Sequence, residues 1–232
     1  MKRIIYSLTL CLIFLGFVAC EDETTQDNSK VTYYAEITLK GDASVFWDLG
    51  TPWEDPGYTA IMKGEDVSNL VEINTNLNVN KGGVYSIDYT VTNEDGISRS
   101  TSRTVYVSDP TPTPITSGVW TVTADSYREA AVTSTYGAEF PITILQVSPG
   151  KFYINDFLGG WYEQRAGYGS SYACSGHFLL DENNIITGAG DGYVPGWGDS
   201  YDTVTGFVND DGSISLTVEY AGMTFNITMT YN

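Results

Sequence analysis

Apolar and polar residues alternate along most of this chain. The alternation is clearest over residues 31–39, 84–91, 105–107, 213–220 and 223–231, which are rich in Val, Ile, Thr and Tyr. A period of two places successive side chains on opposite faces of a strand, whereas a helix needs a period near 3.6 residues. Helical periodicity is nearly absent. We therefore predict an all-β protein built from many short strands.

Short polar segments rich in Asn, Asp and Gly separate the predicted strands. Residues 93–96, 181–184 and 209–212 each lie between two alternating runs. Such residues tolerate the backbone angles of tight turns, so each segment predicts a β-hairpin. Many short strands at this spacing are typical of a β-sandwich or an antiparallel β-barrel.

Prolines divide the chain into two parts, because every second residue from 110 to 114 is proline. Proline at this spacing cannot pair in a central strand and favours an extended, stiff backbone. We predict a first β-domain over residues 31–108, a Pro/Thr linker over 109–114 and a second antiparallel β-domain over 115–232.

The start of the chain has a different pattern, with two basic residues followed by an apolar run over residues 4–18. A membrane-spanning helix needs about 20 apolar residues, so this shorter run predicts a secretory signal over residues 1–19. Residues 17–20 (FVAC) resemble the lipobox of bacterial lipoproteins. The resemblance implies acylation of Cys20, for example by palmitate, and residues 20–30 then form the acylated Cys and a flexible tether.

Residues 21–23 (EDE) resemble the surface-export signal of lipoproteins in glycan-foraging Gram-negative bacteria. This resemblance implies attachment to the outer membrane, facing the cell exterior. A solvated acidic tether is the alternative interpretation of the same residues. The formal net charge of the chain is −18, which disfavours contact with a phosphate backbone, so nucleic acid is excluded as a partner.

Four segments of the first domain carry a family resemblance. They are residues 50–60 (GTPWEDPGYTA), 64–67 (GEDV), the predicted hairpin over 83–96, and 103–107 (RTVYV). Together they resemble a bacterial surface Ig-like domain. The resemblance implies an Ig-like β-sandwich that acts as a spacer and has no catalytic residues.

The second domain is richer in aromatic residues and glycine, with 11 aromatic side chains from Phe152 to Tyr201. Residues 155–162 (NDFLGGWY), 167–169 (GYG) and 196–199 (GWGD) resemble the C-terminal domain of small lipoproteins encoded with outer-membrane glycan uptake systems. The resemblance implies a glycan-binding accessory protein that acts with an importer. The predicted fold is an antiparallel β-barrel or sandwich.

Aromatic rings on glycine-rich loops can lie against the weakly apolar faces of sugars, while carboxylates bond the sugar hydroxyls. This chemistry gives a set of candidate ligand-binding residues. The candidates are Trp161, Tyr162, Tyr168, Tyr172, Tyr193, Trp197, Asp156, Asp191 and Asp199. The alternative is that these rings fill the interior of the domain.

Other chemistry has less support in the sequence. His177 is the single histidine, so a His-rich zinc site and a conventional Ser-His-Asp triad are disfavoured. Cys174 is expected to be an inert buried thiol. The acidic segments at 181–184 and 209–212 lack the twelve-residue spacing of an EF-hand loop, so we interpret them as turns. We predict no cofactor, no metal site and no enzymatic activity.

The sequence therefore predicts a surface lipoprotein that binds extracellular oligo- or polysaccharide or assists a glycan importer. One rival is a structural or adhesive protein that binds a protein partner through an exposed apolar patch. A weaker rival is a glycoside hydrolase that uses paired carboxylates such as Asp156 and Glu163. A glycan binder of the predicted kind should expose two or more co-planar rings on one face.

Overall fold

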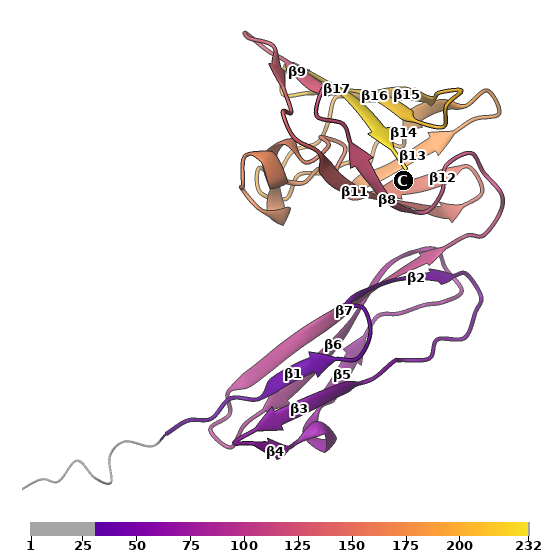
Figure 1. The fold of residues 1–232 in the computed structure, drawn as a ribbon. Coiled ribbons are helices and arrows are strands. Elements are labelled where there is room, and N and C mark those ends of the chain that lie inside the picture. Colours follow the sequence, from indigo (N-terminus) through magenta and orange to yellow (C-terminus); the bar gives the residue numbers. More distant parts are fainter. Residues whose placement is uncertain (1–30, 232) are drawn as a thin grey trace, which may run out of the picture.

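A computed structural model describes residues 31–231 of the chain. The chain forms two β-sheet bodies that follow one another along the sequence, and the C-terminal one is rounder (Figure 1). Three short helical turns are the only helices among the described residues. The predicted all-β fold is therefore confirmed.

The N-terminal body contains two sheets. One has the order β1-β3-β4 and the other β2-β7-β6-β5, in which β2 runs parallel to β7. Their bounds are β1 (Glu36–Leu39), β2 (Ser44–Asp48), β3 (Tyr58–Met62), β4 (Glu65–Asp66), β5 (Glu72–Thr75), β6 (Gly83–Thr92) and β7 (Ser98–Ser108), with the 3₁₀ turn η2 (Ser68–Leu70) between β4 and β5.

Apolar side chains from both sheets form the core of this body. Ile87, Tyr89, Val105 and Val107 on β6 and β7 are buried, and residues of β1 and β3 pack against them. The alternation in the sequence places these side chains on one face of the long hairpin, as period two requires.

Arg103 is a buried charge in this core, with no exposed surface. Its guanidinium donates to the carbonyl oxygens of Lys40 at 2.9 Å and Gly57 at 3.3 Å, and also to that of Asp42. Asp55 lies 3.8 Å from the same guanidinium. The arginine thus fastens the turn after β1 and the turn before β3 to strand β7.

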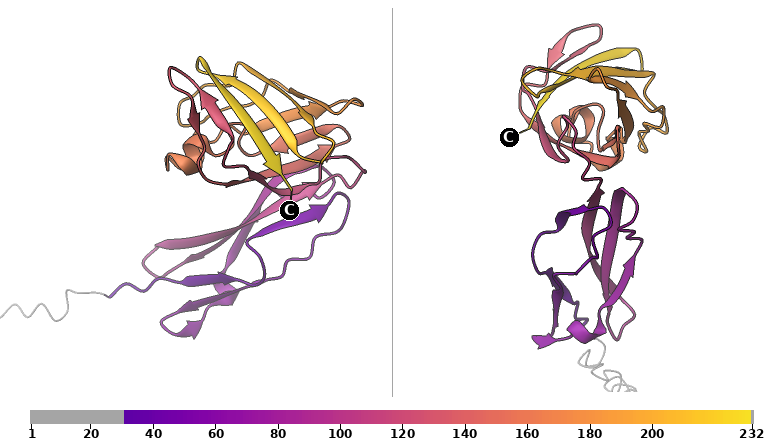
Figure 2. Two further views of the ribbon diagram at one scale, coloured as in Figure 1. Left: turned by 45° about the horizontal axis from the view of Figure 1, so that its top comes forward. Right: turned by 90° about the vertical axis from the view of Figure 1, so that its right-hand side faces the viewer.

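The C-terminal body is a closed barrel of eight antiparallel strands, in the order β17-β16-β15-β14-β13-β12-β11-β8. β17 pairs with β8 to close it, with Met229 opposite Val122. Figure 2 (right) shows the closed ring nearly end-on. The strands are β8 (Gly118–Val122), β11 (Phe140–Ser148), β12 (Lys151–Ile154), β13 (Gly176–Leu180), β14 (Ile185–Gly188), β15 (Thr203–Val208), β16 (Ile214–Tyr220) and β17 (Met223–Thr230).

The C-terminal body also contains short elements that are not among the eight strands of the barrel. The strands β9 (Tyr127–Glu129) and β10 (Ser134–Thr135) form a small ladder that continues from β17. A π-helical turn, η3 (Trp161–Arg165), and a 3₁₀ turn, η4 (Ser170–Tyr172), lie between β12 and β13. This excursion is the longest break between neighbouring strands of the barrel, and it carries most of the candidate residues.

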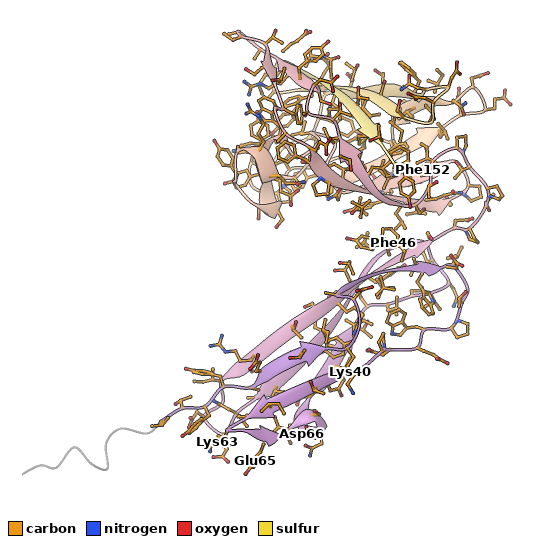
Figure 3. All side chains as sticks on the ribbon, in the orientation of Figure 1. Lys40, Phe46, Lys63, Glu65, Asp66 and Phe152 are labelled. Atoms are coloured by element: carbon orange, nitrogen blue, oxygen red, sulfur yellow. The ribbon has the colours of Figure 1, made fainter. Side chains whose placement is uncertain are left out.

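Alternate side chains fill the barrel interior. On β16 the buried residues are Ile214, Leu216, Val218 and Tyr220, and the residues between them are less buried. Phe152 on β12 stacks on Phe178 on β13 with ring centroids 5.2 Å apart. Figure 3 shows Phe152 in the barrel and Phe46 at the end of the N-terminal body that faces it.

The three predicted turn segments each connect a hairpin. Residues 93–96 join β6 to β7, 181–184 join β13 to β14, and 209–212 join β15 to β16. In the second turn the Asp181 carboxylate accepts from the backbone N–H groups of residues 183 and 185. Asp181 therefore bonds the backbone of its own turn, which is the role that the sequence predicted for the polar residues of these segments.

The two bodies meet along the end of β11. The N–H of Asp109 donates to the carbonyl of Gln146 at 2.8 Å. Gly82, in the loop before β6, approaches Val147 so closely that an added Cβ would stand 2.1 Å from the Val147 carbonyl oxygen. Ile115, just beyond the prolines, is fully buried in the barrel core.

Candidate binding site on the C-terminal barrel

The excursion over residues 155–175 is held at its base by Asp156. One carboxylate oxygen accepts from the N–H groups of Leu158 at 2.8 Å and Cys174 at 2.9 Å, and the other accepts from Gly160 at 2.9 Å. The Phe157 N–H also donates to the Cys174 carbonyl. The start and the end of the excursion are therefore joined through one side chain.

Asp156 is only 1% exposed, so its prediction as a sugar-bonding carboxylate needs correction. Burial raises the pKa of Asp156 to about 6, although the three backbone N–H groups act in the opposite direction. Both oxygens are already occupied by backbone donors. Asp156 therefore positions the excursion over residues 155–175 and does not reach its surface.

Trp161 is the second correction among the candidates, because it is 3% exposed and belongs to the barrel core. The guanidinium groups of Arg128 and Arg165 lie 4.6 and 4.1 Å from its ring centroid. Tyr136 packs edge-on against it at 4.9 Å. The left-handed residue Gly160, with φ of 81°, precedes the π-helical turn in which Trp161 packs inward.

Four of the predicted rings lie together on this excursion and the neighbouring 194–199 turn. Tyr168 is 56% exposed and Trp197 is 43% exposed, and Tyr162 and Tyr172 are half-buried beside them. Trp197 lies 4.6 Å from Tyr162 and 4.8 Å from Tyr172 between ring centroids. We call Tyr162, Tyr168, Tyr172 and Trp197 the aromatic cluster.

Gly196 allows the two loops of the aromatic cluster to approach. An added Cβ there would stand 2.6 Å from the ring of Tyr172. The Gly196 N–H donates to the Ser171 carbonyl at 2.6 Å, which fastens the turn that bears Trp197 to the η4 segment. The glycine density in the sequence thus has a local cause at this position.

The exposed rings of the aromatic cluster are not co-planar, which differs from the arrangement we expected of a glycan binder. Tyr168 and Trp197 lie 6.2 Å apart at an interplanar angle of 83°. Tyr162 and Tyr168 are closer to parallel, at 21°, but Tyr162 is half-buried. Edge-to-face packing between aromatic rings accounts for this geometry. The cluster therefore forms a corner and not a flat platform.

A hollow of about 200 Å³ is built from the segments that bear the aromatic cluster. Its polar lining comprises Tyr153, Asn155, Glu163, Ser170 and Ser175. The Oε2 atom of Glu163 is buried and has no hydrogen-bond partner among the described residues. Burial also raises the pKa of the Glu163 carboxyl.

Glu163 and the serines were not among the candidates predicted as ligand contacts. The available signal for Glu163 was its position directly after two aromatic residues in the Gly- and aromatic-rich segment. Ser170 and Ser175 have no comparable signal, because a serine in a loop is common.

The remaining candidates lie apart from the aromatic cluster or at its border. Asp199 accepts a hydrogen bond from the Tyr220 hydroxyl at 2.7 Å. Burial, together with Asp199, raises the pKa of Tyr220. Tyr193 is 47% exposed, and its backbone N–H donates to the Ser175 carbonyl. Asp191 bonds the Nδ1 atom of His177 at 2.7 Å, near the junction with the N-terminal body.

Comparisons with known proteins connect this architecture to bacterial lipoproteins. Residues 37–107 match the model of the bacterial surface protein Ig-like domain, and residues 109–231 match the model of a C-terminal domain family. The crystal structure of the lipoprotein BT2262 from Bacteroides thetaiotaomicron is 42% identical, with a TM-score of 0.76. The match covers 85% of this chain and 100% of that chain. The chain belongs to the family of this lipoprotein.

Two other comparisons add little to this family assignment. A structure of the CBM51-2 and INT domains of ZmpB from Clostridium perfringens, in complex with GlcNAc, is 19% identical, with a TM-score of 0.27. That match covers 52% of this chain and 29% of that chain. No curated protein matches the chain.

Membership of this lipoprotein family agrees with the predicted N-terminal surface Ig-like domain. The predicted lipidation site, Cys20, lies outside the described residues. No helix within residues 31–231 is long and apolar enough to cross a membrane. In the same part of the chain, no three His, Cys, Asp or Glu side chains are grouped so that they could hold a metal ion.

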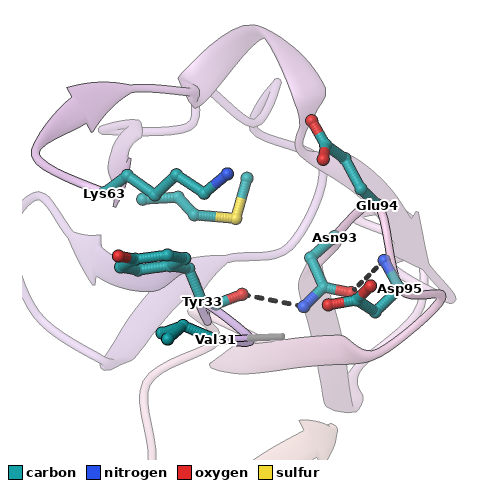
Figure 4. A pocket seen from close by; sticks show the side chains of 7 residues that line it. Val31, Tyr33, Lys63, Asn93, Glu94 and Asp95 are labelled. Carbon is teal, nitrogen blue, oxygen red and sulfur yellow. Dashed lines mark hydrogen bonds between the residues drawn. The ribbon is translucent and has the colours of Figure 1, made fainter. Parts of the chain in front are cut away.

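A second hollow lies in the N-terminal body, lined in part by Tyr33, Lys63 and Asn93 (Figure 4). The Asn93 side chain donates to the Tyr33 carbonyl at 2.7 Å, and Lys63 lies 5.0 Å from the Tyr33 ring centroid. The volume of this hollow is about 30 Å³, which suits a water molecule and not a sugar ring. The site on the barrel is therefore the better candidate for a ligand.

Proposed function

We propose that this protein is anchored to the outer membrane through Cys20, faces the cell exterior and binds extracellular glycan with its C-terminal barrel. The observation that carries the proposal is the corner formed by the exposed rings of Tyr168 and Trp197, which belong to the same segments that line the hollow containing Glu163. The N-terminal Ig-like body would act as a spacer between membrane and barrel. A glycan importer of the same membrane is the partner that this role suggests.

Sugar chemistry fits the geometry of the corner. One pyranose face is weakly apolar and can lie on the exposed ring of Trp197, while Tyr168, at 83° to it, meets the edge of the sugar. A hydroxyl of a sugar unit that enters the hollow can donate to the carboxylate of Glu163, which lines it. Few polar groups fix the orientation of a ligand in such sites, and the rings supply most of the contact area.

Binding is favoured over hydrolysis by the environment of the carboxylates. Asp156 and Glu163 form the acidic pair that the sequence offered for a hydrolase. Asp156 has both oxygens bonded to backbone N–H groups and is almost completely buried, so it cannot act on a substrate as acid, base or nucleophile. We therefore propose capture without a catalytic step.

Affinity electrophoresis of the purified protein in gels that contain plant, host or microbial polysaccharides tests this function. We expect retardation by at least one polysaccharide, and a roughly tenfold weaker interaction in Trp197→Ala, because the ring provides contact area that alanine lacks. Glu163→Gln should also weaken retardation, since a carboxylate is the stronger acceptor. Phe207→Ala is the control, because Phe207 is a 48% exposed ring on β15, outside the aromatic cluster.

Equal retardation of Trp197→Ala and the unchanged protein would contradict the proposed site. An absence of retardation in every gel would contradict glycan binding itself.

A protein partner is a second candidate function, favoured by one specific observation. Leu179, Ile185 and Phe207 on neighbouring strands β13, β14 and β15 are 47%, 46% and 48% exposed, and Ile185 pairs directly with Phe207. Adjacent exposed apolar side chains are typical of protein interfaces. If this surface carries the function, Phe207→Ala should reduce cross-linking to other surface proteins and leave polysaccharide retardation unchanged.

A further inference from the structure

A cleft of about 640 Å³ lies where the two bodies meet. Lys81 and Tyr85 line it from the N-terminal body, and Lys151, Tyr153 and His177 line it from β12 and β13 of the barrel. Pockets that bind small molecules have volumes of roughly 300–1,000 Å³ and often lie between domains. The size and position of the cleft therefore suit a ligand.

The charge of this cleft is opposite to that of the whole protein. The chain has 29 acidic and 11 basic residues, yet none of the described residues that line the cleft is Asp or Glu. The ammonium groups of Lys81 and Lys151 make no ion pair or hydrogen bond with any described residue. Two unpaired cations in one cleft of an acidic protein create a local attraction for anions.

The other cationic side chains of the described region are already engaged. Arg103 bonds backbone carbonyls, and Arg128 and Arg165 lie against the Trp161 ring. Lys63 lies over the Tyr33 ring and Arg99 lies over the Tyr34 ring. The pKa of Asp66 is lowered mainly by hydrogen bonds from Ser68, and the charge of Lys40 adds to this lowering. Lys81 is distinguished by having no such role. Lys151 makes no such contact, but its positive charge is the last of the causes that lower the pKa of Asp191, after the hydrogen bonds from His177 and against the effect of burial.

Two contacts hold the walls of the cleft in place. The Asp191 carboxylate accepts from the backbone N–H of His177 at 2.8 Å and bonds its Nδ1 atom at 2.7 Å, which leaves Nε2 as the ring nitrogen that can bond a ligand. On the other wall, the Tyr85 hydroxyl donates to the Lys81 carbonyl at 2.7 Å. Side chains oriented before binding reduce the entropy lost when a ligand binds.

Close contact between the bodies fixes the width of the cleft. Gly82 stands between Lys81 and Gly83 in the lining, and its backbone touches Val147 at the end of β11. No side chain fits there without moving one body away from the other, since an added Cβ would lie 2.7 Å from the Val147 Cα atom.

Tyr153 connects this cleft to the proposed glycan site. It lines both the cleft and the hollow that contains Glu163. A saccharide chain that contacts the aromatic cluster and follows the hollow would therefore bring its next units toward Lys151 and His177.

We propose that the cleft between the two bodies binds the carboxylate or sulfate group of an acidic saccharide. The anion would accept charge-assisted hydrogen bonds from Lys81 and Lys151 and a further bond from His177 or the Tyr153 hydroxyl. This inference rests on the proposed glycan-binding function for the nature of the ligand, and it specifies the class of glycan as anionic.

His177 provides a direct reporter, because it is the single histidine of the chain and lies in the cleft. Its imidazole C–H signals can be followed by NMR while galacturonate, galactose 6-sulfate or galactose is added. These three probes share a sugar ring and differ in the charged group. We expect a saturable shift with galacturonate or galactose 6-sulfate, whichever group the cleft takes, and none with galactose.

Matched variants locate the effect. Lys151→Met and Lys81→Met should each lower the affinity for the charged sugar about tenfold, whereas Lys63→Met, which removes the same charge far from the cleft, should not. Gly82→Ala should also weaken binding, because it separates the walls. No shift with either charged sugar, an equal shift with galactose, or equal affinities of Lys151→Met and Lys63→Met would overturn the proposal.

Failure of the proposed glycan function is distinguishable from failure of this inference. Retardation in neutral polysaccharide gels reports on the aromatic cluster, and the His177 signals report on the cleft. Loss of neutral glycan binding with an intact His177 response supports the anion site. Neutral glycan binding without a His177 response to either charged sugar overturns it.

Discussion

The N-terminal body buries a guanidinium group and the barrel buries a carboxyl group, and each of them bonds the backbone, but the two differ in sign and in effect. In the N-terminal body the donor Arg103 satisfies backbone carbonyls around β1 and β3. In the barrel the acceptor Asp156 satisfies backbone N–H groups at the base of the 155–175 excursion. Buried polar groups of the backbone require such partners, because leaving one unpaired costs about 1–3 kcal/mol.

The difference lies in what each contact leaves exposed. Around Arg103 the turns are held against strand β7. Trp47 and Trp53 pack edge-on against each other, with ring centroids 4.9 Å apart, and both lie against the core. Around Asp156 only the base of the loop is fixed, and the rings beyond it, including Tyr168, remain exposed. The first arrangement holds the turns of the N-terminal body against its strands and the second displays side chains, although both use one buried charge.

The largest effect is expected from Arg103→Met, which removes the donor of the N-terminal body. The free energy of unfolding of that body should fall by about 3–5 kcal/mol, because the carbonyls lose their partner and Asp55 loses its counter-charge. Denaturant unfolding followed by circular dichroism measures the change. Arg99→Met is the control, since Arg99 lies over the Tyr34 ring at the surface and should contribute less than about 1 kcal/mol.

The barrel should retain polysaccharide retardation in the Arg103→Met variant, because the aromatic cluster belongs to the other body. A fall of less than about 1 kcal/mol in the free energy of unfolding would show that water replaces Arg103 as the donor to these carbonyls, and it would contradict the stabilising role assigned to Arg103.

A pH-dependent effect of about 3 kcal/mol is expected from Asp156. Burial raises its pKa from 3.8 to about 6 in the folded state, so the folded state holds its proton more tightly than the unfolded state. The stability linked to this proton is fully present below about pH 4 and is lost as the pH rises through 6. Each pKa unit corresponds to about 1.4 kcal/mol.

Asp156→Asn isolates this effect from the other carboxylates, because asparagine does not titrate. Its amide has only one acceptor oxygen, so at least one of the backbone N–H groups of residues 158, 160 and 174 loses its acceptor. The variant should therefore be less stable than the unchanged protein near pH 4, by about 1–3 kcal/mol, and this difference should shrink as the pH rises to 7. The measurement is urea unfolding of both proteins from pH 4 to pH 7. A difference that does not vary with pH would contradict the assigned titration.

The strands and hairpins could be predicted because their signals are local. Alternation over residues 213–220 gives the face of β16 that is buried, and Asp181 forms its turn with neighbours two and four residues away. Closure of the barrel could not be predicted in this way. It depends on the pairing of β17 with β8, whose strands are separated by most of the domain, so barrel and sandwich remained alternatives.

The candidate site could be predicted only in part, for a related reason. Tyr162, Tyr168, Tyr172 and Trp197 come together, but Trp161, next to Tyr162, lies in the core. Outside regular strands no period distinguishes inward from outward side chains. The left-handed Gly160 and the π-helical turn determine which ring points inward, and neither is evident from the composition of the segment.

The smallest effect is expected from Gly196→Ala, which tests whether the loop contact beyond the base maintains the aromatic cluster. The added methyl would stand 2.6 Å from the Tyr172 ring, so the ring must shift, at a cost of about 1 kcal/mol. Tyr172 and Trp197, now 4.8 Å apart, should separate.

Cross-relaxation between the ring protons of Tyr172 and Trp197, measured by NMR, reports this separation directly. Polysaccharide retardation should weaken in parallel, although Asp156 and the base of the excursion are unchanged. Ser200→Ala, at an exposed position of the same loop, should alter neither quantity. If Gly196→Ala leaves both the ring contact and the retardation intact, the corner does not depend on the approach of the two loops, and Asp156 alone maintains the display of the rings.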